Sequence, residues 1–149
     1  MHFWHGIQRA VLSRVSAGGE GKTFVYRFDV VTDYNYFKKF SKSEEISGAA
    51  HGDDFSYLFF GTYQAPPAID SKAFECIKKM VAIYTSFAST GNPNNMEIGD
   101  VEWKPVTSMT TPFNCLNITA DDNKEIPLPE HERLAVWDTF YIEQNIPLY

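Results

Sequence analysis

Hydrophobic positions recur with helical spacing most clearly over residues 73–90. Apolar side chains there fall three and four positions apart, which is typical of a helix with one buried face. Ser71 or Asp70 can cap the start of this helix, and Gly91 is a natural residue to end it. The predicted buried face consists of Phe74, Ile77, Met80, Val81, Tyr84, Phe87 and Ala88.

Two further stretches, 3–15 and 129–143, show the same helical spacing. Glycines at 18–21 end the first helix, and Pro129 suits the first turn of the second. A helix normally begins behind a Ser, Thr, Asp or Asn cap, and the helix over 3–15 has none in front of it. We therefore expect that sequence preceding this chain is missing.

Alternating apolar and polar residues predict one clear strand, over 23–31. Valines make both of its faces apolar near the ends, as in a sheet that is covered on both sides. Only two further short candidates occur, around Ile46 and over 113–118, and the segments 32–50 and 61–70 are predicted loops. The pattern predicts an α/β fold that is incomplete as an independent domain.

Composition and charge narrow the function. The chain has 149 residues, of which 44% are hydrophobic and 15% aromatic, so it can bury a core. A net charge of −6 with scattered basic residues argues against binding nucleic acid, which needs clustered Lys and Arg. No apolar run approaches the ~20 residues of a membrane span. The residues after Met1 do not resemble a signal peptide, which favours the cytoplasm.

The two cysteines and one asparagine carry weaker signals. Cys76 falls in a predicted helix and Cys115 in a predicted strand, and reduced, packed thiols are favoured over a disulfide. The tripeptide at 117–119, Asn-Ile-Thr, matches the N-glycosylation pattern. An ordinary strand or loop residue is the favoured interpretation of Asn117.

The strongest chemical signal is His51, within the segment Gly-Ala-Ala-His-Gly-Asp-Asp-Phe-Ser-Tyr-Leu-Phe at 48–59. An imidazole held by a carboxylate can take the proton of a hydroxyl nucleophile and return it to a leaving group. A metal site using His51, Asp53 and Asp54 is a weaker alternative, because one histidine and two acids in one loop make a poor ligand set.

His2 and His5, one helical turn apart, are a second candidate metal pair. A site needs a third ligand and supporting contacts around it, which this spacing does not supply. Packed or solvated helix histidines are therefore the favoured interpretation.

Five segments, in order along the chain, resemble the C-terminal portion of type B carboxylesterases. This family also holds cholinesterases and juvenile hormone esterases, and the chain is most similar to its insect detoxification-type (alpha) esterases. The matching segments are 3–7 with 13–14, 25–29, 48–59, 87–94 (Phe-Ala-Ser-Thr-Gly-Asn-Pro-Asn), and Trp103-x-Pro105 with 115–118.

The resemblance implies that residues 1–149 form a C-terminal segment of an α/β-hydrolase domain. His51 would be the catalytic histidine of a Ser-Glu-His triad, and Asp54 a buried carboxylate that orients its loop. Tyr34 and Phe37 are candidates to line an ester pocket, but plain packing is the favoured interpretation of both. The implied substrates are small-molecule carboxylic esters, and no cofactor is implied.

The family's other catalytic groups are not found in this sequence. Its nucleophile lies in a Gly-x-Ser-x-Gly turn, which occurs nowhere in the 149 residues. Its triad glutamate and oxyanion hole also come from earlier segments. The sequence therefore predicts a serine carboxylesterase segment that needs an N-terminal part and is inactive alone. The alternative is a non-catalytic binding or interaction module.

Overall fold

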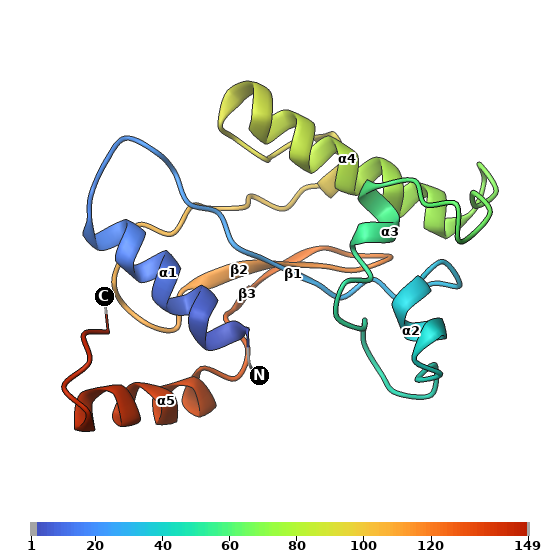
Figure 1. Ribbon diagram of the computed structural model, residues 1–149. Helices are drawn as coiled ribbons and strands as arrows, with labels where there is room; N and C mark the ends of the chain where they lie inside the picture. Colours follow the sequence, from blue (N-terminus) through green and yellow to red (C-terminus); the bar gives the residue numbers. More distant parts are fainter. Residues whose placement is uncertain (1–2, 149) are drawn as a thin grey trace. The chain divides into compact units, whose positions relative to one another are not determined.

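A computed structural model describes residues 3–148, and the chain divides into two compact units. The first unit comprises Met1–Val25, Lys104–Cys115 and Ile126–Tyr149, and the second comprises Tyr26–Trp103 and Leu116–Glu125. The strands are β1 (Tyr26–Phe28), β2 (Asn114–Ile118) and β3 (Lys124–Pro127) (Figure 1). They form one sheet in the order β1-β2-β3.

Strands β1 and β2 run parallel, with Tyr26 opposite Leu116 and Phe28 opposite Ile118. The predicted strand over 23–31 is confirmed in position, but only three of its residues pair as β1. The strand predicted over 113–118 is confirmed as β2. The candidate around Ile46 is wrong, because that residue lies in a bend whose N–H bonds back to Ser43. Strand β3 has no alternating pattern and was not predicted.

Helix α4 (Lys72–Thr90) begins and ends where its sequence predicts. The Ser71 hydroxyl oxygen accepts the backbone N–H of Phe74 at 3.2 Å, which satisfies one of the otherwise unpaired N–H groups of the first turn. Gly91 adopts a left-handed conformation with φ of 70° and ends the helix. The best-defined helix of the chain is thus specified by its own capping residues.

The buried face of α4 differs from the predicted one. The buried positions are Ala73, Cys76, Lys79, Met80 and Ile83. Of the predicted face, Met80 is buried, whereas Val81, Tyr84 and Phe87 are 41%, 44% and 45% exposed. The apolar stripe is wider than the surface that the second unit offers it, so periodicity alone placed the centre of the face incorrectly.

Helices α1 (Trp4–Ser16) and α5 (His131–Glu143) confirm the other two predicted helices within two residues at each end. Three short elements were not expected: α2 (Tyr36–Phe40), α3 (Phe55–Leu58) and the 3₁₀ turn η1 (Met96–Ile98). Each has five residues or fewer, which is too short to show a helical period. Helix α2 interrupts the predicted loop over 32–50.

The first unit is built around α1, which packs against α5 (Figure 1). The His5 imidazole Nε2 lies 2.7 Å from Asp138 Oδ1, and the Arg9 guanidinium lies 3.8 Å from the centre of the Tyr141 ring. His5 is therefore a packed histidine with a carboxylate partner, while His2 lies outside the described residues. The core comprises Val11, Leu12, Val25, Val106, Phe113, Cys115, Leu128 and Leu134.

In the second unit, α4 packs against α3 and η1. Its fully buried apolar side chains include Val30, Tyr57, Met80, Leu116 and Ile118. These come from the segment just after β1, from α3, from α4 and from β2, so the core of this unit joins the sheet to its helices.

Both cysteines are free and buried, as the favoured interpretation of the sequence required. Burial raises the pKa of the Cys76 thiol, so this side chain behaves as a packed, neutral group.

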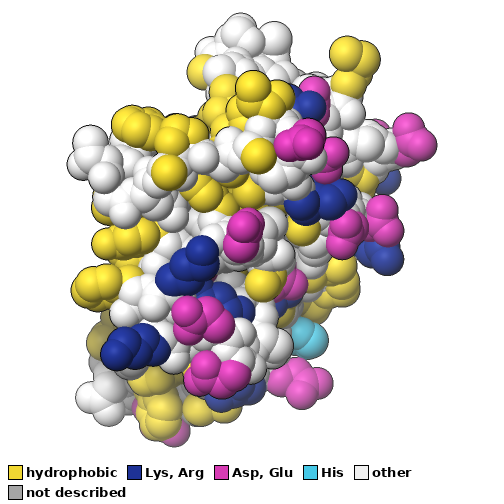
Figure 2. Space-filling view, turned by 90° about the vertical axis from the view of Figure 1, so that its right-hand side faces the viewer, with side chains coloured by type: hydrophobic (Ala, Val, Ile, Leu, Met, Phe, Trp, Pro, Cys, Tyr) yellow, Lys and Arg dark blue, Asp and Glu magenta, His cyan; other side chains and the backbone are white. Residues whose placement is uncertain are grey.

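Acidic and basic side chains are interspersed on the face shown in Figure 2, which carries no broad patch of one sign. This distribution agrees with the scattered lysines and arginines of the sequence. Among residues 3–148, no helix is both long and apolar enough to span a bilayer.

Replacing Ser71 with Ala should lower the free energy of unfolding by about 1 kcal/mol, because the N–H of Phe74 loses its capping acceptor. Chemical denaturation followed by circular dichroism measures this loss. Ser89→Ala, near the other end of α4, is the matched control and should change the free energy of unfolding by less than about 0.5 kcal/mol. Equal effects at both serines would contradict the role of the cap.

Candidate functional site

His51 lies on an exposed turn between α2 and α3, in the second unit. Glycines flank it: Gly48 has φ of 86° and Gly52 has φ of 87°, a backbone conformation that other residues rarely adopt. A Cβ at Gly52 would lie 3.3 Å from the Phe37 ring, so the loop runs closely over α2. The glycines therefore bring the loop into a path that turns His51 outward.

Asp53 holds this loop in place through hydrogen bonds. Its side chain is fully buried, and its carboxylate accepts three N–H bonds. Ala50 donates its backbone N–H to Oδ2 at 2.8 Å, Asn35 Nδ2 donates to the same oxygen at 2.9 Å, and Lys38 donates its backbone N–H to Oδ1 at 3.1 Å. Bonds to an ionised acceptor are stronger than neutral ones, so the loop is held firmly to α2.

The buried polar network continues beyond Asp53. The Tyr57 hydroxyl donates to Asn35 Oδ1 at 2.8 Å and lies 2.6 Å from the Thr32 hydroxyl oxygen. Burial raises the pKa of Tyr57 well above its ordinary value, so this hydroxyl stays neutral and able to donate. Lys38 also donates its ammonium Nζ to the carbonyl oxygen of Gly48, at the start of the loop.

The buried carboxylate expected at Asp54 is found at Asp53 instead. Asp54 is only partly buried. It lies near Tyr26, whose pKa is raised by burial first, then by the Tyr84 hydroxyl and then by the Asp54 carboxylate. The two neighbouring acids look equivalent in the sequence, and only the positions of the N–H donors distinguish them.

The two aromatic residues predicted to line a pocket have different surroundings. Tyr34 is 7% exposed and packs edge-on against Tyr57, with 5.7 Å between the ring centres, which agrees with the packing alternative. Phe37 is 36% exposed and lies against Gly52, next to His51 in the sequence. Of the pair, only Phe37 borders the histidine loop with an accessible ring.

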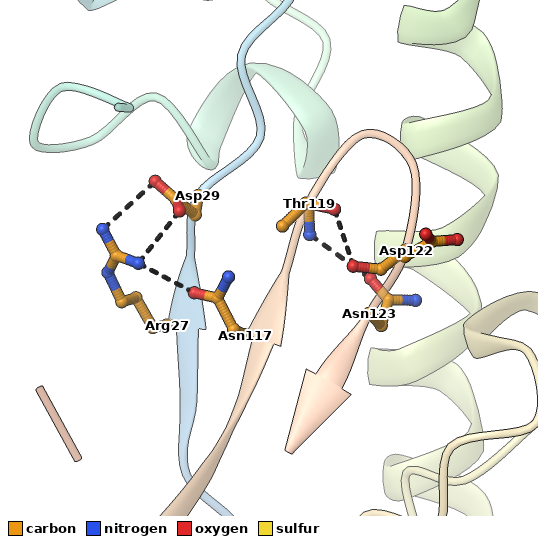
Figure 3. Close-up of polar contacts among 6 residues, drawn as sticks. All are labelled: Arg27, Asp29, Asn117, Thr119, Asp122 and Asn123. Atoms are coloured by element: carbon orange, nitrogen blue, oxygen red, sulfur yellow. Dashed lines mark hydrogen bonds and ion pairs between the residues drawn. The ribbon is translucent and has the colours of Figure 1, made fainter. Parts of the chain in front are cut away.

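A polar cluster occupies one face of the β1–β2 pair (Figure 3). The Arg27 guanidinium donates to Asp29 Oδ2 at 2.9 Å and to Asn117 Oδ1 at 3.0 Å. A Cβ at Gly48 would lie 3.5 Å from Asp29 Oδ1, so this cluster borders the start of the histidine loop. Asn117 is thus a paired strand residue, as the favoured interpretation of the sequence had it.

Among the described residues, no three His, Cys, Asp or Glu side chains gather where a metal ion could bind. Both Asp53 oxygens already accept N–H bonds.

Replacing Asp53 with Asn should lower the free energy of unfolding by about 2–4 kcal/mol, because an amide nitrogen would face an N–H donor inside the core. Asp54→Asn is the matched control and should cost less than about 1 kcal/mol. Denaturant titration of the three proteins measures both values. A larger loss at Asp54 than at Asp53 would contradict the assignment of the loop-holding carboxylate.

Comparison with known proteins assigns the chain to a family. A model of the carboxylesterase family matches residues 1–137. Esterase B1 of Culex pipiens is 31% identical over 147 residues, which cover 97% of this chain and 27% of the relative. Juvenile hormone esterase of Tribolium castaneum is 24% identical, again over 97% of this chain and 27% of the relative.

A comparison of three-dimensional structures supports the same family at the level of the fold. The crystal structure of juvenile hormone esterase from Manduca sexta, with OTFP covalently attached, superposes with a TM-score of 0.68 at 21% identity. The match covers 90% of this chain and 25% of that one, so the chain has the fold of part of an α/β-hydrolase. It spans 27% of the length of Esterase B1. With the family model matching most of its residues, the chain belongs to the carboxylesterase family.

Proposed function

We propose that this chain supplies the catalytic histidine of a serine carboxylesterase, with His51 as the general base. The observation that carries the proposal is the combination of an exposed imidazole with a firmly held loop. A base must reach a nucleophile and a substrate, and it must also stay aimed at them. The glycines beside His51 and the buried Asp53 meet these two requirements together.

In the proposed reaction, a serine hydroxyl attacks the carbonyl carbon of an ester while His51 takes the hydroxyl proton. The protonated imidazole then gives that proton to the oxygen of the leaving alcohol, and an acyl-serine remains. His51 next takes a proton from water, which attacks the acyl group and releases the carboxylic acid. The imidazole returns the proton to serine.

No Gly-x-Ser-x-Gly turn occurs in the chain, so the proposed serine belongs to a segment outside these residues. The resemblance to carboxylesterases implies the same for the triad glutamate and the oxyanion donors. The proposal therefore includes a need for the N-terminal part of the enzyme. Small-molecule carboxylic esters are the proposed substrates, as the names of the esterase relatives indicate. Phe37 is the proposed contribution to the ester pocket, and Asp54 stays a candidate for orienting the loop from the side of Tyr26.

The isolated chain should hydrolyse a nitrophenyl or naphthyl ester no faster than its His51→Ala variant, because a base without a nucleophile has no hydroxyl to activate. Absorbance assays at matched protein concentrations compare the two. Hydrolysis by the unaltered chain above the rate of His51→Ala would contradict the proposed dependence on missing segments.

Labelling the native protein tests the proposal directly. Source tissue is treated with a fluorophosphonate probe, which reacts with activated serines, and an antibody to residues 129–149 identifies the band on a denaturing gel. We expect a labelled band several times heavier than 17.0 kDa. Pretreatment with an unlabelled organophosphate is the control and should remove the label. An unlabelled band at 17.0 kDa would overturn the proposal and favour a non-catalytic binding module.

A further inference from the structure

Asn35 is a buried amide in which every polar position is engaged. It is 1% exposed. Its Nδ2 donates to the carbonyl oxygen of Val30 at 2.8 Å and to Asp53 Oδ2 at 2.9 Å. Its Oδ1 accepts from the Tyr57 hydroxyl at 2.8 Å and from the backbone N–H of Thr32 at 2.9 Å. Two donors and two acceptors fill the hydrogen-bonding capacity of a primary amide, so its orientation is fixed.

Two successive hydrogen bonds connect Asn35 with the backbone next to His51. Asn35 holds Asp53 Oδ2, and the same oxygen accepts the backbone N–H of Ala50, the residue directly before His51. At its other end, Asn35 is tied to Val30, two residues beyond the end of β1. A continuous series of short bonds therefore connects the sheet to the backbone that carries the imidazole.

We propose that Asn35 is a positioning residue for His51, acting through Asp53 to fix the backbone on which the imidazole stands. This inference rests on the proposed role of His51 as a general base. A displacement of about 1 Å at a catalytic group can slow a reaction by about a hundredfold, so rigid support matters for such a base.

The chemistry of the site distinguishes positioning from simple filling of space. Aspartate has nearly the same shape as asparagine, but Asn35→Asp would place a second carboxyl group at 2.9 Å hydrogen-bonding distance from Asp53. Two carboxyl groups this close share one proton. In acid, that proton replaces the lost N–H donor, whereas in alkali two negative charges repel each other and release the loop.

The other ionisable groups around the pair do not supply this pH dependence. Tyr57 from α3 stays neutral, since burial raises its pKa. Lys38 from α2 directs its ammonium to the carbonyl of Gly48. Asp33 and the Cys76 thiol of α4 act electrostatically on Tyr57, and His51 lies on the exposed side of the loop.

The test is amide hydrogen exchange of Ala50 and Lys38 in the 149-residue chain at pH 5.5 and 8.5, resolved to single residues by mass spectrometry. Asn92→Asp is the matched control. Asn92 is exposed, and its Oδ1 accepts hydrogen bonds from the backbone N–H and the Nδ2 of Asn94. A carboxylate oxygen can accept the same two bonds. Comparing variants at the same pH removes the intrinsic pH dependence of exchange.

In Asn35→Asp we expect exchange of both amides within about twofold of the control at pH 5.5 and at least about tenfold faster at pH 8.5. Met80 and Ile83 in α4 should exchange at the control rate at both pH values. A merely structural role would instead speed exchange throughout the unit at both pH values. Three outcomes would overturn the inference: faster exchange throughout the unit at both pH values, an effect on Ala50 and Lys38 that does not depend on pH, or unprotected amides of these two residues in the unaltered chain.

Failure of this inference can be told apart from failure of the proposed function. Exchange reports hydrogen bonds and needs no hydrolysis, so a negative result there leaves the esterase proposal standing. An unlabelled protein in the fluorophosphonate experiment overturns the esterase proposal whatever the exchange shows.

Discussion

The acceptance of three N–H bonds by one buried carboxylate is the interaction on which the site depends. An ionised group inside a protein is costly unless its oxygens are fully bonded, and the donors to Asp53 supply those bonds. They come from a segment before α2, from α2 itself and from the histidine loop. The requirement to satisfy Asp53 therefore holds the segment of α2 and the histidine loop together and leaves His51 facing outward.

Elsewhere in the second unit, one strand edge is open and several apolar side chains are exposed among the described residues. Strand β1 has one strand neighbour among the described residues, and α4 exposes Val81, Tyr84 and Phe87. The hydroxyl groups of Tyr84 and Tyr26 lie 2.7 Å apart, so this exposed part of α4 lies beside a side chain of β1. Exposed apolar surface and an open strand edge are both features through which a protein can contact other polypeptide.

Local signals made part of this structure predictable. The ends of α4 depend on Ser71 and Gly91, whose effects reach only a few residues, and both were identified from the sequence. The buried face of α4 and the length of β1 depend on what packs or pairs with them, which a periodic pattern does not contain. At the site, the neighbours of His51 made it a candidate in the sequence, whereas the choice between Asp53 and Asp54 as the buried carboxylate depended on donors up to 18 residues away.

A histidine that serves as a base must satisfy two opposed demands, and the loop separates them in space. Accessibility comes from Gly48 and Gly52, which let the backbone turn at positive φ without strain. Rigidity comes from Asp53 and Asn35, which are buried and leave no bonding position unused on the amide. Glycine alone would give a mobile imidazole, and a buried carboxylate alone would draw the loop inward. The loop therefore combines exposure with hydrogen-bonded support, and the proposed role of His51 rests on this combination.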